Sequence, residues 1–219
     1  MNLTRRQLLK AVAAAAVAWK AAAWPVRPPA AFAQAAPDDP AIVPTLEAFA
    51  DTLIPGEKRH PGDRAIAGAA AGPGAVQAGA VDLLNFPPAG VAATVPAIVA
   101  GINARASGYA LANAIVLDPT VPPMVSLNFE QRTAFLVQLL DGNDPDQLAF
   151  FAVAALMYLA YHTAGHLHLA DAVRGGHPGM AALGFPSPDD DDLWRFPDSS
   201  YRRALARPHP RTGKRGNPW

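Results

Sequence analysis

The sequence predicts an all-α protein with a single helical domain, on three observations. No stretch alternates apolar and polar residues at the period of two that is typical of a half-buried strand. Apolar side chains instead recur at the i, i+3, i+4 spacing of a helix face, beginning with Leu46 and Phe49. Asn128 and Gln131 form the capping-box pair of a helix start ahead of a further apolar run. We expect a helical bundle with long loops and an extended C-terminal tail.

Three segments divide the chain: residues 1–33 as a targeting signal, 34–186 as the helical domain and 187–219 as an extended or disordered tail. The part after the signal is long enough for one domain with its own core. From Tyr201 onward the tail has six basic residues, no acidic residue and three prolines. Such a composition buries too little apolar surface to fold alone, so we expect the tail to be disordered or to wrap along a partner.

The first segment has the pattern of a twin-arginine export signal. Arg5 and Arg6 precede a pair of leucines and an alanine-rich run, and small residues up to Ala33 predict cleavage before Gln34. The alternatives are an amphipathic N-terminal helix or a single membrane anchor, but Lys20 keeps the apolar run below the roughly 18–20 residues that a spanning helix needs. We therefore expect an exported protein that engages the twin-arginine translocase and has no stable membrane span after cleavage.

The charge and cysteine content exclude several classes of function. The chain has 18 basic and 18 acidic residues; five of the basic residues and none of the acidic ones fall in the signal, which leaves 13 basic and 18 acidic residues. A mildly acidic protein gives no reason to expect nucleic acid as a partner. The absence of cysteine excludes disulfides, thiol nucleophiles and cysteine metal sites.

The first two predicted helices flank a loop rich in glycine and alanine. Residues 44–54 form an amphipathic helix, which Pro55 and the glycine after it end. A second helix is expected to carry Val76, Ala80 and the leucines that follow. Residues 91–117 should then be helical, with Pro96 tolerated only in the first turn.

The second half of the chain contains the two best-defined helices. One begins at the Asn128 cap and ends at Gly142. The other starts at Pro145 and runs to about Val173, and its residues 148–161 are apolar on every side. Fourteen such residues are too few to cross a bilayer, so we expect the central helix of the bundle, with one face against another protein as the alternative.

Three consecutive features resemble a known family. A helix ending at residues 53–55, a Pro-Gly-Asp loop at 61–63 and a helix reading GAVQAGAVDLL at 74–84 resemble the gluconate 2-dehydrogenase subunit 3 family and its actinobacterial relatives. Segments 128–140 and 148–186 resemble it too, although Met180 stands where many relatives have tryptophan.

The resemblance implies a function without catalysis on this chain. Family members are small accessory subunits of flavin dehydrogenases, and many carry the export signal for the whole complex. The implied partner is a large flavin-dependent oxidoreductase subunit of the glucose–methanol–choline type. The implied FAD is held by that partner, and no cofactor is expected here.

Histidines are the main candidates for chemistry on this chain. His162 and His166 share one face if the last long helix is continuous, whereas His168 points elsewhere. A metal or haem site would need a further ligand, such as His177 or Asp171. We favour structural or interface histidines, and keep an exported metal- or haem-binding protein or enzyme centred on His162 and His166 as the alternative.

No other pattern in the sequence carries a catalytic mechanism. The chain has no nucleophile elbow, P-loop, zinc-protease motif or dinucleotide fingerprint. Glu47 and Asp51 lie one turn apart on the first helix, and we expect them on a solvated polar face rather than in an acid–base pair. The charged residues 57–64 could form a plain surface or the rim of an interface. No catalytic residue is therefore predicted.

Overall fold

The computed structural model describes residues 39–141 and 146–188, and every regular element in these two stretches is helical. The predicted all-α, single-domain class is confirmed. The elements are, in chain order, α2 (Ile42–Leu53), α3 (Ala80–Asn85), the 3-10 turns η2 (Pro87–Ala89) and η3 (Ala92–Thr94), α4 (Val95–Ala112), α5 (Pro123–Ser126), α6 (Phe129–Leu139), α7 (Gln147–Thr163), α8 (Leu169–Arg174) and α9 (Pro178–Ala182).

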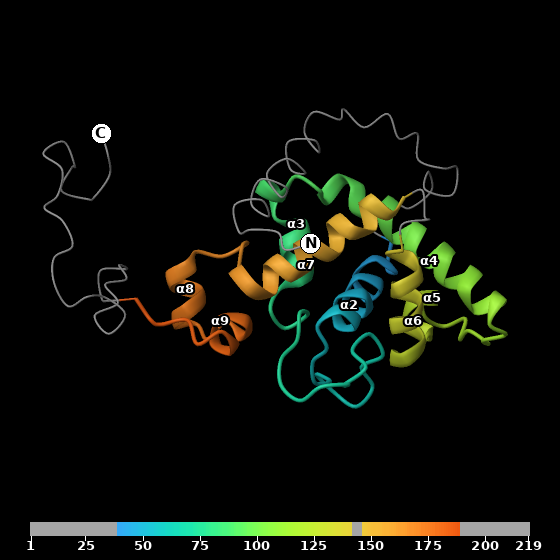
Figure 1. Ribbon diagram of the computed structural model, residues 1–219, viewed down its shortest axis with the longest axis horizontal. Coiled ribbons are helices and arrows are strands. Elements are labelled where there is room, and N and C mark those ends of the chain that lie inside the picture. The colour runs from blue at the N-terminus through green and yellow to red at the C-terminus, as the bar shows by residue number, and fades with distance from the viewer. Residues whose placement is uncertain (1–38, 142–145, 189–219) are drawn as a thin grey trace, which may run out of the picture.

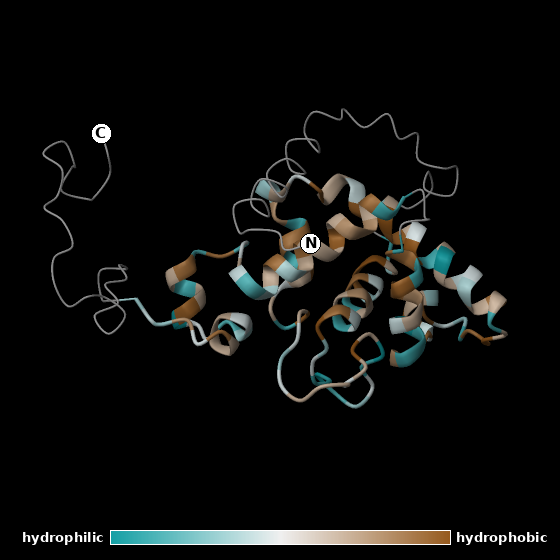
Figure 2. Ribbon diagram, viewed as in Figure 1, coloured by the Kyte–Doolittle hydropathy of each residue, from teal (hydrophilic) through white to brown (hydrophobic). Residues whose placement is uncertain are grey.

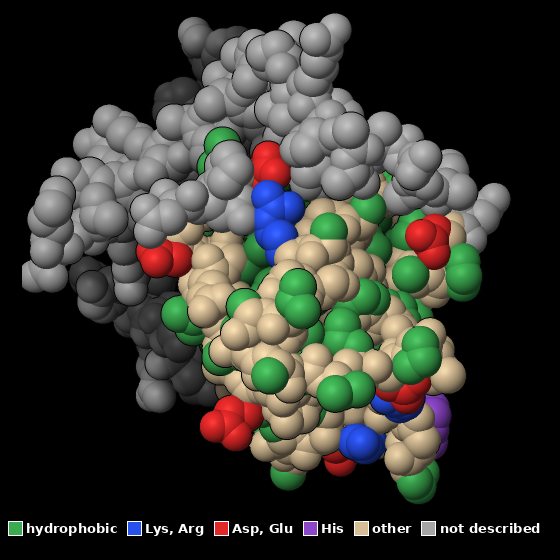
Figure 3. Space-filling model, turned by 90° about the vertical axis from the view of Figure 1, so that its right-hand side faces the viewer, with side chains coloured by type: hydrophobic (Ala, Val, Ile, Leu, Met, Phe, Trp, Pro, Cys, Tyr) green, Lys and Arg blue, Asp and Glu red, His purple; other side chains and the backbone are tan. Residues whose placement is uncertain are grey.

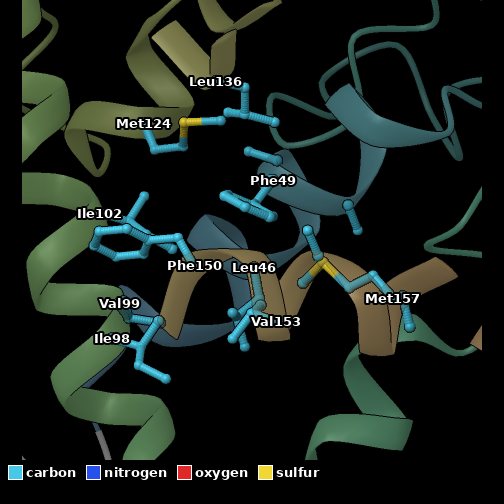
Figure 4. Close-up of a cluster of buried hydrophobic side chains, with 14 of the residues drawn as sticks. Leu46, Phe49, Ile98, Val99, Ile102, Met124, Leu136, Phe150, Val153 and Met157 are labelled. Carbon is cyan, nitrogen blue, oxygen red and sulfur yellow. The ribbon is translucent and has the colours of Figure 1, made fainter. Parts of the chain in front are cut away.

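Helix α2 lies at the centre of the bundle. It contacts α3, α4, α5, α6 and α7, and α8 and α9 lie beyond the C-terminal end of α7 (Figure 1). Leu46 and Phe49 of α2 are fully buried. Figure 4 shows them facing side chains of four other helices, which are Ile98, Val99 and Ile102 of α4, Met124 of α5, Leu136 of α6, and Phe150, Val153 and Met157 of α7. Burial of such side chains stabilises the fold by about 1.5–3 kcal/mol each.

Several predicted boundaries are confirmed. Helix α2 ends at Leu53, just ahead of Pro55. Pro96 lies in the first turn of α4, the one place where its missing N–H costs nothing. Asn128 accepts the N–H of Gln131 while the Gln131 side chain accepts the N–H of Asn128, so the capping box is complete.

Two predicted helices are wrong in extent. The second helix begins only at Ala80, because Gly79 has a left-handed backbone (φ 77°) and Val76 lies in the turn before it. The long helix predicted from Pro145 to about Val173 is two helices, since Ala164 also adopts a left-handed conformation (φ 49°) and ends α7. The packing explains this break, because Ala164 is fully buried in a small second cluster with Ala172 and Met180.

Helix α7 is hydrophobic along most of its length (Figure 2). Within residues 39–141 and 146–188, no helix combines the length and the apolar character that crossing a membrane requires. The face of the molecule in Figure 3 shows hydrophobic side chains interspersed with acidic and basic ones, as on an ordinary protein surface. The apolar character of α7 is therefore a local feature that needs its own explanation.

Candidate functional site

The connecting loop, residues 54–79, joins α2 to α3 without any helix or strand. Loops of this length are uncommon in compact domains and are usually functional or unstructured. This one is closed at its base, where Ala75 donates its N–H to the Ile54 carbonyl at 3.0 Å and Glu57 donates to Gly72 at 2.7 Å. A Cβ at Gly74 would lie 2.5 Å from the Ile54 oxygen, so only glycine permits this approach.

Asp51 holds the connecting loop from the side of α2. Its carboxylate is 1% exposed and accepts the backbone N–H of Gly56 at 3.1 Å and of Ala67 at 2.8 Å. Burial raises the pKa of Asp51, while the two N–H donors and the charge of Arg132 act in the opposite direction. The expectation that Glu47 and Asp51 lie on a solvated face is wrong for Asp51, because α2 is surrounded by other elements and buries Thr45 and Ala48 as well.

Arg132 of α6 holds the loop from the opposite side. Its side chain is 2% exposed and donates to the carbonyls of Ala65 at 2.6 Å and Arg64 at 2.8 Å, both in the loop. It also donates to Met124 at 3.2 Å and Val125 at 2.7 Å, next to α5. Burial lowers the pKa of Arg132, an effect that the nearby charge of Asp51 opposes. One guanidinium thus satisfies carbonyls from two segments that have no ladder of their own.

Charged pairs form the outer edge of the loop. Arg59 binds both oxygens of Glu47 at 2.6 and 2.8 Å and also pairs with Asp63 at 2.7 Å. Burial would raise the pKa of Asp63, but the hydrogen bonds from Arg59 and from the Ile66 N–H outweigh it and lower that pKa. Glu47 is therefore an ion-pair partner rather than a solvated carboxylate.

An open pocket of about 550 Å³ lies between this edge and residues 119–125. Its lining includes charged side chains of both signs, among them Arg64, which pairs with Asp118 at 2.6 Å. Two hydrogen bonds from Thr120 and the pair with Arg64 lower the pKa of Asp118. Because its charges are already paired, the pocket is suited to polar contacts with a macromolecule rather than to proton transfer.

The structure separates the predicted histidine pair. His162 is near the end of α7 and stacks on Tyr158 (ring centroids 5.7 Å), whereas His166 follows the left-handed turn at Ala164. They do not share a helix face, so the geometric basis for a site centred on the two is wrong. His168 pairs weakly with Asp171 at 3.7 Å on the surface.

His166 instead lies beside His177, with ring centroids 6.4 Å apart. The Nε2–H tautomer of His177 donates to the Ala78 carbonyl at 3.1 Å, which links α9 to the end of the connecting loop. His166 fits against Gly79, where a Cβ would overlap its Nε2 atom. Burial lowers the pKa of His166, the charge of Asp82 raises it and His177 lowers it further. Among the described residues, no three His, Asp or Glu side chains are grouped so as to hold a metal ion.

The outward face of α7 is the second unusual surface. Phe150, Val153 and Met157 are buried, as expected of a core helix. The opposite side exposes Leu148, Phe151, Tyr158 and Leu159 by 70%, 58%, 45% and 43%. The core interpretation therefore holds for one side of the helix only.

The predicted export features lie outside the described residues. This applies to Arg5 and Arg6, to the cleavage position between Ala33 and Gln34, and to the basic tail from Arg202 onward. They remain predictions from sequence.

Sequence reasoning missed Asp51 as an anchor and did not single out Arg132. A signal for Arg132 exists, because it precedes Phe135, Leu136 and Leu139 at the i, i+3, i+4, i+7 spacing of one helix face. An arginine on an apolar face is expected to be buried with partners. Asp51 gives no comparable signal, because its burial depends on elements that are distant in sequence.

Comparisons with known proteins give one match. The model of a family of unknown function (DUF5987) matches residues 41–219. No curated protein and no solved structure matches the chain.

Proposed function

This chain belongs to the DUF5987 family, and we propose from that starting point that it is a non-catalytic accessory subunit that binds a large flavin-dependent oxidoreductase and escorts it through the twin-arginine pathway. The resemblance of residues 44–86 to the gluconate 2-dehydrogenase subunit 3 family supports the type of partner, a glucose–methanol–choline oxidoreductase that carries the FAD. The exported complex would reside in the periplasm, the cell envelope or the extracellular space.

The observation that carries this proposal is the anchored connecting loop. Asp51 and Arg132 are both almost completely buried, and between them they fix the backbone of a segment that has no regular structure. Ordering such a loop costs about 1–2 kcal/mol of backbone entropy per residue. A rigid loop with an exposed, charged outer edge forms a preorganised surface, which lowers the entropic cost of binding a protein.

The composition of the loop supports protein binding rather than catalysis. Its exposed positions include Gly68, Ala69 and Ala71, whose small side chains let another backbone approach closely. The Arg59 and Arg64 ion pairs beside them are suited to the polar rim of an interface.

The export signal explains why such a subunit would exist. The twin-arginine pathway moves folded proteins, and a partner that acquires its FAD in the cytoplasm has to be exported folded. A subunit that shares its own signal would make the location of the partner depend on it. The complex must survive transport, so we expect an interface of more than about 2,000 Å².

The experiment is co-purification from the native host followed by disruption of the loop. Replacing Ala69 and Ala71 with arginine should release a yellow, FAD-containing partner, since large charged side chains would prevent close approach. The matched control is the same change at Ala92 and Ala93, two exposed alanines on η3. The proposal fails if no flavoprotein co-purifies with the wild type, or if both double variants retain it equally.

The histidine alternative is tested on the same purified chain. An absorption spectrum and a metal analysis distinguish the two: a Soret band or one metal ion per chain would favour a metal- or haem-binding protein.

A further inference from the structure

The outward face of α7 is long, apolar and free of charge. Residues 148–161 contain no acidic or basic side chain. Leu148, Phe151, Ala152, Ala155 and Leu159 follow the i, i+3, i+4, i+7, i+11 spacing that aligns side chains along one side of a helix. All five are at least partly exposed. An uncharged stripe of this kind along a 17-residue helix is a sign of an interface rather than of a scattered surface residue.

The stripe is also symmetric about the middle of the helix, between Val153 and Ala154. Leu148 and Leu159 are equally far from this midpoint, and so are Ala152 and Ala155. Phe151 and Tyr158, the two exposed aromatic residues, lie on the same side of the stripe near its two ends. Large side chains thus occupy both ends, and small ones occupy the centre.

We propose that this face binds the same face of a second copy of the chain, with the two α7 helices antiparallel. A twofold axis beside the helix midpoint places Leu148 of one copy against Leu159 of the other, and Ala152 against Ala155. The alanines at the centre let the two helix axes approach closely, and the leucines close the ends. Such a contact is isologous, because each copy presents the same self-complementary patch.

The symmetry of the stripe is what favours a second copy over a different protein. A heterologous partner needs only a complementary surface and gives no reason for equal residues at equal distances from the midpoint. An antiparallel pair requires that arrangement, because each position meets its counterpart across the axis. The proposed escort function does not depend on this dimer, since the connecting loop is a separate surface.

Cysteine cross-linking tests the arrangement directly, because the chain has no cysteine of its own. Leu148→Cys and Leu159→Cys are each made singly in the full-length chain, and the variants are mixed and oxidised. The antiparallel dimer predicts a covalent product in the mixture. Each variant alone should stay uncross-linked, because the two copies of one position are then about 16 Å apart along the helix, too far for a disulfide.

A second measurement gives the oligomeric state without cross-linking. Sedimentation should show a wild-type dimer, and Ala155→Glu should weaken it at least about tenfold by placing a charge at the centre of the contact. The matched control is Val137→Glu, at an exposed apolar position of α6 outside the stripe, which should leave the dimer unchanged. Circular dichroism checks that both variants are folded.

Three outcomes would overturn the proposal. A monomer at all concentrations, with no cross-link in the mixture, means that something other than a second copy covers the stripe. Cross-linking of either single variant by itself indicates parallel or non-specific association. A dimer that Val137→Glu disrupts and Ala155→Glu does not would place the contact elsewhere. Each of these results leaves the flavoprotein experiment with the Ala69 and Ala71 variant unaffected.

Discussion

Arg132 donates a hydrogen bond to the carbonyl of Ala65 at 2.6 Å, although the two residues are 67 positions apart in sequence. Asp51 reaches the same part of the connecting loop from the other side, at the N–H of Ala67. A buried cation thus holds carbonyls and a buried anion holds N–H groups within three residues of each other. The loop owes its conformation to these two side chains, because it has no helix or sheet bonds to define it.

Replacing Arg132 with methionine should lower the free energy of unfolding by about 3 kcal/mol. The apolar side chain fills the space but leaves the carbonyls of Ala65 and Val125 without donors, and each unsatisfied buried group costs about 1–3 kcal/mol. Urea unfolding measures the change. The control is Arg64→Met, which removes an exposed ion pair worth at most about 1 kcal/mol. Equal losses in the two variants would contradict the role of Arg132.

Replacing Asp51 with alanine should loosen the connecting loop more than the rest of the fold. The N–H groups of Gly56 and Ala67 lose their acceptor, so their hydrogen exchange should accelerate, while exchange in α7 changes less. Glu47→Ala is the control on the same helix, since Glu47 binds only the exposed side chain of Arg59. Uniform acceleration across the bundle would mean that Asp51 stabilises the whole fold instead.

Gly74→Ala should destabilise the protein by about 1–3 kcal/mol, the usual cost of overpacking. Its new Cβ would lie 2.5 Å from the Ile54 oxygen and 2.6 Å from the Gly56 nitrogen, both backbone atoms at the closed base of the loop. Gly62→Ala is the control, because the nearest atom there is a histidine ring atom at 3.6 Å. Thermal unfolding compares the two, and an unchanged midpoint for Gly74→Ala would show that the base opens freely.

Acidification should destabilise the fold through His166. Burial lowers the pKa of His166 below its ordinary value of 6.5, so the unfolded chain takes up a proton more readily than the folded one. The contribution to stability is present above pH 6.5 and is lost as the pH falls from there toward the folded pKa. Urea unfolding of the wild type and of His166→Gln, measured at several values from pH 7.5 to 5.5, should give a flatter pH dependence for the variant. An identical slope would assign the effect to other groups.

Local sequence signals predicted the elements that depend on local chemistry. The Asn128–Gln131 capping box and the position of Pro96 follow from backbone hydrogen bonding within a single helix, and both are confirmed. The break at Ala164 could not be predicted in this way, because an alanine has high helix propensity and adopts a left-handed conformation only where packing demands it.

The candidate site was harder to predict than the helices. The position of the loop between its flanking helices was evident from proline and glycine, but its two anchors were not. The helical wheel treats α2 as having one buried face, whereas the helix is enclosed and buries Asp51 too. The histidine pair failed for the same reason as the long helix, since its geometry assumed that α7 continues past Ala164.

The export signal gives the last prediction. Replacing Arg5 and Arg6 together with lysine should leave the precursor in the cytoplasm, because the twin-arginine pathway recognises the arginine pair rather than its charge alone. Lysine preserves the positive charge, so a loss of export would separate this pathway from a signal that needs only basic residues. Cell fractionation with mass spectrometry of the N-terminus measures both parts of the prediction. In the wild type the exported chain should begin near Gln34, and its proposed oxidoreductase partner should be exported with it. In the double-lysine variant both proteins should stay inside, with the partner folded around its flavin. An exported chain that keeps Met1 would indicate a membrane anchor, and a partner exported without this chain would refute the escort function.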